Sequence, residues 1–143
     1  MYARTRLAAL TAAALLSATW FAGGVATAGP VVPMCDELVA TIVIPMPGLV
    51  TNTGPGDDVV VGTAGTDTIN SEAGDDHVCA GDGNDHITTG AGADRAFGEG
   101  GDDTWLGGAG DDYFDGGPHI EGDRGNGNGG TNTCVRTEFT KNC

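Results

Sequence analysis

Residues 107–115 read GGAGDDYFD, and this order of glycine, aspartate and an apolar residue recurs every nine residues through the middle of the chain. The fourth place of each nonapeptide is glycine: Gly56, Gly65, Gly74, Gly83, Gly92, Gly101 and Gly110. The sixth place is aspartate: Asp58, Asp67, Asp76, Asp85, Asp94, Asp103 and Asp112. The eighth place is apolar: Val60, Ile69, Val78, Ile87, Ala96, Trp105 and Phe114. Three residue classes held in phase indicate a repeat architecture, which a disordered glycine-rich linker does not require.

Each nonapeptide divides into a loop and a short strand. The first six places are rich in glycine, which adopts positive φ and lets backbone carbonyls gather around a centre. The last three places, such as residues 113–115, predict a strand whose middle side chain points away from its two neighbours. One such unit cannot bury its apolar residue, whereas stacked units can, so the pattern predicts a solenoid.

The motif G-G-x-G-x-D-x-U-x, closely copied in residues 81–87 and 107–114, resembles the repeats-in-toxin (RTX), or hemolysin-type, calcium-binding nonapeptide. The resemblance covers residues 53–115 strongly. It extends more weakly to the C-terminus, where residues 133–135 and Glu138 look like the closing segment of small secreted members. It implies an all-β fold, a parallel β-roll or β-solenoid in which two nonapeptides make one turn, with calcium ions between loops stacked on the same edge.

The seven sixth-place aspartates are the candidate metal ligands. Calcium takes about six to eight oxygen ligands, and two stacked loops together offer backbone carbonyls and carboxylates for one ion. Since consecutive repeats lie on opposite edges, one edge carries Asp58, Asp76, Asp94 and Asp112, and the other carries Asp67, Asp85 and Asp103. The gaps between these loops predict about five calcium ions. The fifth-place aspartates Asp57, Asp75, Asp102 and Asp111 are expected to add solvated charge without binding metal.

The formal charge of −14 favours cations as partners and excludes nucleic acid, since no basic patch is present to neutralise phosphates. Repulsion among the carboxylates and the small apolar filling predict that calcium binding supplies much of the folding free energy.

The first 28 residues have the layout of a secretory signal peptide. Arg4 and Arg6 precede an apolar run over residues 7–22, and residues 26–28 form a small-x-small cleavage site. A retained anchor helix is the alternative, and after cleavage no membrane span is expected. The predicted organisation is then an N-terminal cap over 29–52 with a strand at 38–44, the roll over 53–115, and a degenerate repeat and C-terminal cap over 116–143. In that last segment Glu121 is expected at the sixth place of one repeat and Asn132 replaces aspartate in the next.

Four cysteines in an exported chain favour two disulfides, for which three connectivities exist. Cys134 and Cys143 enclose a short loop and form the preferred pair, which leaves Cys35 with Cys79 and ties the N-terminal cap to the roll. A zinc site is the rival interpretation, but no CxxC pair occurs.

No catalytic set is found, so the chain is not expected to be an enzyme. Ser71 is the sole serine after the leader, it lies in no nucleophile-elbow context, and no HExxH motif occurs. The favoured hypothesis is a secreted, extracellular bacterial protein that acts as a calcium-binding structural or interaction module, with an unidentified protein or surface partner. The alternative is an adhesion or ice-binding surface on the same roll. A regular outward Thr or Asn ladder would favour ice binding, but the seventh and ninth places are mixed.

Overall fold

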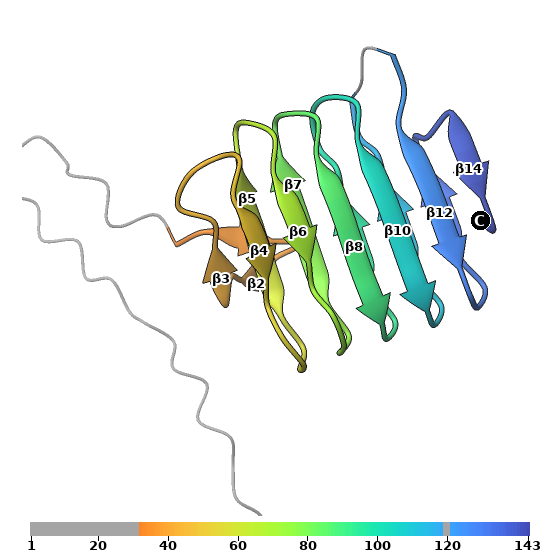
Figure 1. Ribbon diagram of the computed structural model, residues 1–143, viewed down its shortest axis with the longest axis horizontal. Helices are drawn as coiled ribbons and strands as arrows, with labels where there is room; N and C mark the ends of the chain where they lie inside the picture. Colours follow the sequence, from red (N-terminus) through yellow and green to blue (C-terminus); the bar gives the residue numbers. More distant parts are fainter. Residues whose placement is uncertain (1–31, 119–120) are drawn as a thin grey trace, which may run out of the picture. The chain divides into compact units, whose positions relative to one another are not determined.

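The computed structural model describes residues 32–118 and 121–143, so the predicted leader over residues 1–28 lies outside the described part. Two parallel six-stranded sheets make up the body (Figure 1). Sheet C contains β4 (Val50–Asn52), β6 (Thr68–Asn70), β8 (His86–Ala91), β10 (Thr104–Ala109), β12 (Arg124–Asn128) and β14 (Phe139–Lys141). Sheet B contains β3 (Ile42–Val43), β5 (Val59–Thr63), β7 (His77–Gly81), β9 (Arg95–Phe97), β11 (Tyr113–Asp115) and β13 (Thr133–Val135).

The chain alternates between the two sheets, so each strand pairs with the strand two repeats later. Val60 lies beside Val78 in sheet B, and Ile69 lies beside Ile87 in sheet C. Eighteen residues therefore make one full turn, which is two nonapeptides. The prediction of an all-β parallel solenoid is confirmed, and the described residues contain no helix. Accordingly, that part of the chain has no helix that could span a bilayer.

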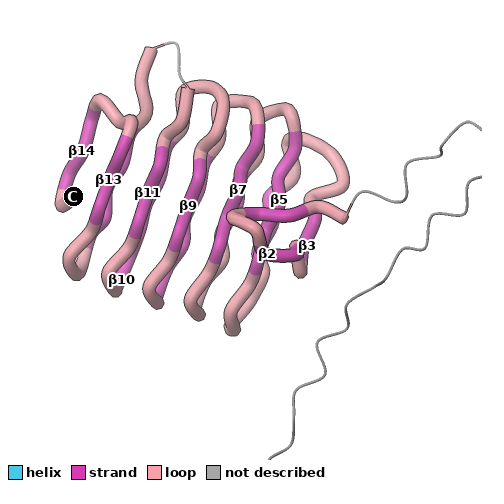
Figure 2. The backbone as a smooth tube through the Cα atoms, turned by 180° about the vertical axis from the view of Figure 1, so that it is seen from behind, coloured by secondary structure: helices cyan, strands magenta, loops and turns pink. Residues whose placement is uncertain are grey.

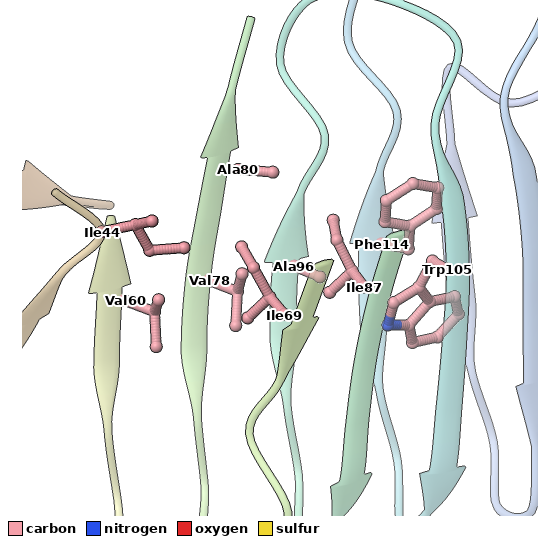
Figure 3. Close-up of a cluster of buried hydrophobic side chains, with 9 residues drawn as sticks. All are labelled: Ile44, Val60, Ile69, Val78, Ala80, Ile87, Ala96, Trp105 and Phe114. Carbon is pink, nitrogen blue, oxygen red and sulfur yellow. The ribbon is translucent and has the colours of Figure 1, made fainter. Parts of the chain in front are cut away.

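The eighth-place residues point between the sheets and form a single column of core side chains (Figure 3). All seven are at most 1% exposed. Trp105 and Phe114 fill the C-terminal part of this column, with stacked rings whose centroids are 5.2 Å apart. One filler residue per half-turn gives a thin core, so the edges must contribute to holding the turns together.

Glycine at the fourth place permits the loops to stack. At Gly92 the backbone has φ of +151°, and a Cβ built there would overlap the carbonyl oxygen of Gly74 in the loop one turn earlier. Only glycine fits this combination of conformation and close backbone approach.

The N-terminal segment differs from the expected single strand over residues 38–44. β1 (Met34–Cys35) and β2 (Leu38–Val39) form an antiparallel hairpin, because Asp36 and Glu37 adopt positive φ and turn the chain back. β3 then joins sheet B beside β5. Figure 2 shows the hairpin lying outside sheet B, where β1 contacts β5 and β7. The predicted Cys35–Cys79 disulfide is confirmed and fastens the hairpin to β7.

At the C-terminal end both sheets continue past the last regular repeat. β12 pairs with β10, and β13 pairs with β11. These offsets are 20 residues instead of 18, so the two extra residues are absorbed in the connecting loop. The predicted Cys134–Cys143 disulfide is also confirmed, and it closes the chain over the end of the core.

Truncation of one ring of the stacked aromatic pair should show how much the core contributes to the free energy of unfolding. Phe114→Ala in the calcium-loaded protein is expected to lower the free energy of unfolding by about 3–5 kcal/mol, because a large buried side chain leaves a cavity between the sheets. Urea unfolding followed by far-UV circular dichroism measures it. The control is Leu106→Ala, whose side chain is 42% exposed, and equal losses in the two variants would contradict the packing described.

Candidate functional site

The sixth-place aspartates form two columns of hydrogen bonds, one on each edge of the solenoid. We define the first edge as the loops 53–58, 71–76, 89–94 and 107–112. Asp58, at the start of the column, accepts the hydroxyl of Thr41 at 3.1 Å. Each later aspartate uses one carboxylate oxygen to accept the backbone N–H of the aspartate one turn earlier. The N···O distances are 2.9 Å for Asp58 to Asp76, 2.9 Å for Asp76 to Asp94 and 3.1 Å for Asp94 to Asp112. Asn132 continues the column, since its side-chain oxygen accepts the N–H of Asp112 at 2.8 Å.

The second edge consists of the loops 62–67, 80–85 and 98–103 and the loop that follows them. Asp67 donates its N–H to Asp85 at 2.7 Å, and Asp85 donates to Asp103 at 2.8 Å. The next acceptor is Asp123, at 2.7 Å from the nitrogen of Asp103. The expectation that Glu121 takes this place is wrong: Glu121 is exposed, because the two-residue insertion moves the sixth place to Asp123. Glu138 ends the column by accepting the N–H of Asp123.

Among the described residues, the other oxygen of most of these aspartates meets no donor in hydrogen-bonding geometry, although the hydroxyls of Ser71 and Thr89 oppose the rise in pKa of Asp76 and Asp94. This holds for Oδ1 of Asp67 and for Oδ2 of Asp76, Asp85, Asp94, Asp103 and Asp112. These six aspartates are at most 3% exposed. A buried carboxylate oxygen without a donor is costly, and a repeated row of them indicates a place for cations.

The position of these oxygens is apparent at the first place of the loop, where glycine has no side chain to collide with them. A Cβ built on Gly98 would run into Oδ2 of Asp103 and the carbonyl oxygen of Gly116, one turn later. At Gly107 the corresponding atoms are Oδ2 of Asp112 and the carbonyl oxygen of Gly127. We call this space, lined by a carboxylate and a carbonyl of the next turn, the oxygen cradle. Carboxylate and backbone carbonyl oxygens are the ligands that calcium prefers, so the residues present fit that ion.

The carboxylates are electrostatically strained without a cation. Burial raises the pKa of Asp85 to about 7, and the charges of Asp103 and Asp67 add to the rise. Burial likewise raises the pKa of Asp94 and that of Asp103 to about 6, with a further rise from the neighbouring aspartates of the column. The backbone N–H that each accepts opposes these shifts without cancelling them. Aspartates stacked one per turn therefore favour either protonation or a bound cation.

The fifth-place aspartates do more than add solvated charge. Asp57 accepts the N–H of Asp75 at 2.9 Å, and Asp75 accepts that of Ala93 at 2.8 Å, so they form an outer column of hydrogen bonds on the first edge. His77 and His86 lie on β7 and β8, in different sheets, and do not converge. Within the described ranges no three His, Cys, Asp or Glu side chains form a metal cluster, so an ion between the loops must also use backbone oxygens.

Fold and edges together define a class: a parallel β-roll whose stacked loops bury unpartnered aspartate oxygens. The sequence comparison identifies the repeats themselves. Residues 52–87 and 88–118 match the family described as the RTX calcium-binding nonapeptide repeat (4 copies), so this part of the chain is a calcium-binding repeat module. No match was found in a search of curated proteins, and none among solved structures.

The calcium-free protein should become more structured on acidification. The pKa values of Asp85, Asp94 and Asp103 in the folded state lie above the ordinary aspartate value of 3.8, so the folded state binds more protons between about pH 4 and pH 7. The three aspartates therefore do not destabilise the folded state below about pH 4, and their destabilising effect is complete once the pH has risen through about 7.

Far-UV circular dichroism of calcium-free protein at pH 5, 6, 7 and 8 measures this effect as the strand signal. We expect the signal to fall as pH rises, and Asp85→Asn to flatten the change above pH 6 because it removes the group with the highest pKa. A strand signal that grows from pH 5 to pH 8 without calcium would contradict the strain described.

Proposed function

We propose that this chain is an exported calcium-binding protein whose roll assembles when calcium enters the gaps between stacked loops. The ligands are the seven sixth-place aspartates Asp58, Asp67, Asp76, Asp85, Asp94, Asp103 and Asp112, together with Asp123, and backbone carbonyls of the same loops. The observation that carries this proposal is the row of buried carboxylate oxygens without a protein donor. A divalent cation would supply the missing partner and neutralise two stacked carboxylates at once.

Calcium is proposed to drive folding because little else can offset the charge. The core holds one apolar residue per half-turn, and the carboxylates of each edge repel one another. When sites exist only in the folded chain, the binding free energy of the ions becomes folding free energy. We expect a loose chain without calcium and a compact one with it.

The number of ions follows from the stacking of the loops. Six of the hydrogen bonds between sixth-place residues join one aspartate to another, three on each edge. The sequence estimate of about five ions counted only gaps between the seven regular aspartates. Asp123 adds one more gap on the second edge, between its own loop and that of Asp103. Asn132 carries no charge, which weakens the gap that it shares with Asp112.

The proposed setting is outside a bacterial cell. The layout of residues 1–28 supports export, and two disulfides support an oxidising compartment. Extracellular calcium modules typically bind at about 10⁻⁴ to 10⁻³ M, a range that separates the outside from the cytoplasm. We propose a structural or interaction module with no enzymatic activity, because the acidic side chains are accounted for by the stacked edges.

An adhesion surface is the second candidate, and one observation favours it. The outward side chains of β4, β6, β8 and β10 carry no carboxylate, although the chain as a whole is acidic. Thr68, Asn70, Thr88 and Thr104 lie on this face of sheet C, and Asn70 donates to Asn52 on the neighbouring strand at 3.1 Å. The residue types at the seventh and ninth places look mixed along the sequence because successive repeats contribute to opposite sheets.

A calcium titration tests the proposed function. Strand signal in far-UV circular dichroism should appear as calcium is added to the chelator-treated protein at pH 8, and magnesium should not replace it because it demands a smaller, octahedral site. Equal signal with and without chelator would reject calcium-driven folding.

A pair of adjacent aspartates separates ligands from surface charge. Asp76→Asn should shift the calcium midpoint to higher concentration by about tenfold, because it removes a charged ligand shared by two gaps. Asp75→Asn removes the same charge one residue away and keeps an oxygen that can accept the N–H of Ala93. Equal shifts in the two variants would mean that net charge, not ligation, governs the response.

A further inference from the structure

The first place of the repeat is not uniform, and its side chain occupies the position of the oxygen cradle. It is glycine in Gly62, Gly98, Gly107 and Gly116 and alanine in Ala80, and at Gly98, Gly107 and Gly116 no side chain separates the carboxylate oxygen from the backbone. On the first edge the earlier loops instead begin with Thr53, Ser71 and Thr89. Ser71 and Thr89 are fully buried, so these hydroxyls belong to the interior of the edge and not to its surface.

The three hydroxyls form a column of hydrogen bonds along the first edge. Thr53 donates to the carbonyl oxygen of Ser71 at 2.9 Å, and Ser71 donates to that of Thr89 at 3.0 Å. Thr89 continues the column toward the carbonyl oxygen of Gly107 at 3.4 Å. Each acceptor is the first-place carbonyl of the next turn, the same type of atom that lines the open cradle at Gly98.

The Thr89 hydroxyl is held from a second side. The indole Nε1 of Trp105 donates to its oxygen at 3.3 Å, so this hydroxyl connects the core column to the edge. A hydroxyl carries a single proton, and here both the carbonyl of the next turn and the carboxylate of Asp94, whose rise in pKa Thr89 opposes, attract that proton. The oxygen also accepts the indole N–H, so it has one lone pair fewer to offer a cation.

These contacts separate the gaps into two kinds. In an open cradle, as at Gly98, a carboxylate oxygen and a carbonyl oxygen lie close together with no side chain between them, and a cation would satisfy both. In a filled gap, as at Ser71, a protein hydroxyl occupies the space and already hydrogen-bonds the carbonyl. Calcium affinity rises with the number of charged and carbonyl oxygens that a site offers, so a filled gap offers less.

We propose that the first-place residue sets the calcium affinity of each gap, so that the ions fall into two classes. The tight class occupies the open gaps, represented by Gly98 with Asp103 and Asp123. The weak class occupies the gaps filled by Thr53, Ser71 and Thr89 on the first edge. This inference rests on the proposed calcium-binding function and specifies which loops of the roll respond at low calcium and which respond at high calcium.

The test counts ions. Native mass spectrometry at defined free calcium gives the number bound, and isothermal titration calorimetry gives the affinity classes of the same samples. The full mature chain is expected to show two classes. Ser71→Gly opens a filled gap and should move about one ion from the weak class to the tight class. Ser71→Thr keeps the hydroxyl, as the chain itself does at Thr89, and should titrate as the unaltered protein does.

Two further variants complete the design. Asn70→Gly places the same substitution one residue earlier, on the outward side of β6, and controls for the backbone freedom that glycine adds. Gly98→Ser fills an open cradle and should remove about one ion from the tight class. If Gly98→Ser does not fold, Ser71→Gly with its two controls still decides the question.

The outcomes distinguish failure of this inference from failure of the proposed calcium binding. A single affinity class that Ser71→Gly leaves unchanged overturns the inference, as does an equal shift in Ser71→Gly and Asn70→Gly. In both cases calcium still binds and the proposed function stands. Absence of any bound ion in the unaltered protein overturns the proposed function itself.

Discussion

The structure depends on one carboxylate arrangement that recurs along both edges. After the first aspartate of each edge, every sixth-place aspartate fastens its loop to the loop one turn earlier with one oxygen, as Asp76 does with the N–H of Asp58. The second oxygen stays buried without a protein partner. The first oxygen fixes the stacking distance between turns, and the second makes that stacking unfavourable unless a positive charge arrives. In the proposed function, assembly and metal binding are coupled through the same side chain.

Other features of the molecule are consistent with this coupling. Glycine at the fourth place lets the loops approach closely, as Gly92 shows against Gly74. The interior column of single apolar residues is too thin to dominate, which leaves the edges in control of stability. The two disulfides act at the ends, where a stacked unit lacks a neighbour on one side. The N-terminal hairpin is held further by Asp36, which pairs with Arg95 at 3.0 Å across sheet B.

Because the first place of the repeat varies, the gaps of the roll are not expected to respond to calcium in the same way. A hydroxyl at the first place, as in Ser71, supplies a hydrogen bond that belongs to the protein whether or not calcium is present. A glycine at the same place, as in Gly98, leaves the oxygens to a cation. The repeat is thus a common frame in which a single side chain adjusts how strongly each gap depends on the ion. The outward side chains of β4, β6, β8 and β10 carry no carboxylate, so one body can present a carboxylate-free face while its edges bind metal.

The sequence favoured one cysteine pairing among three, and by itself it determined the period, the strand centres and the edge to which each regular aspartate belongs. These follow from residue classes at fixed spacing, because every repeat places the same atoms in the same local conformation. Asp123 was missed because the insertion breaks the count from the N-terminal side, although counting back nine residues from Asn132 reaches it. Only the tertiary structure decided the hairpin turn at Asp36 and Glu37, the unpartnered oxygens and the place of the Ser71 hydroxyl. The last two features arise between residues one turn apart, so they depend on how loops stack and not on the order of residues within one loop. The hairpin is local in sequence, but it packs on β5 and β7, which lie far along the chain.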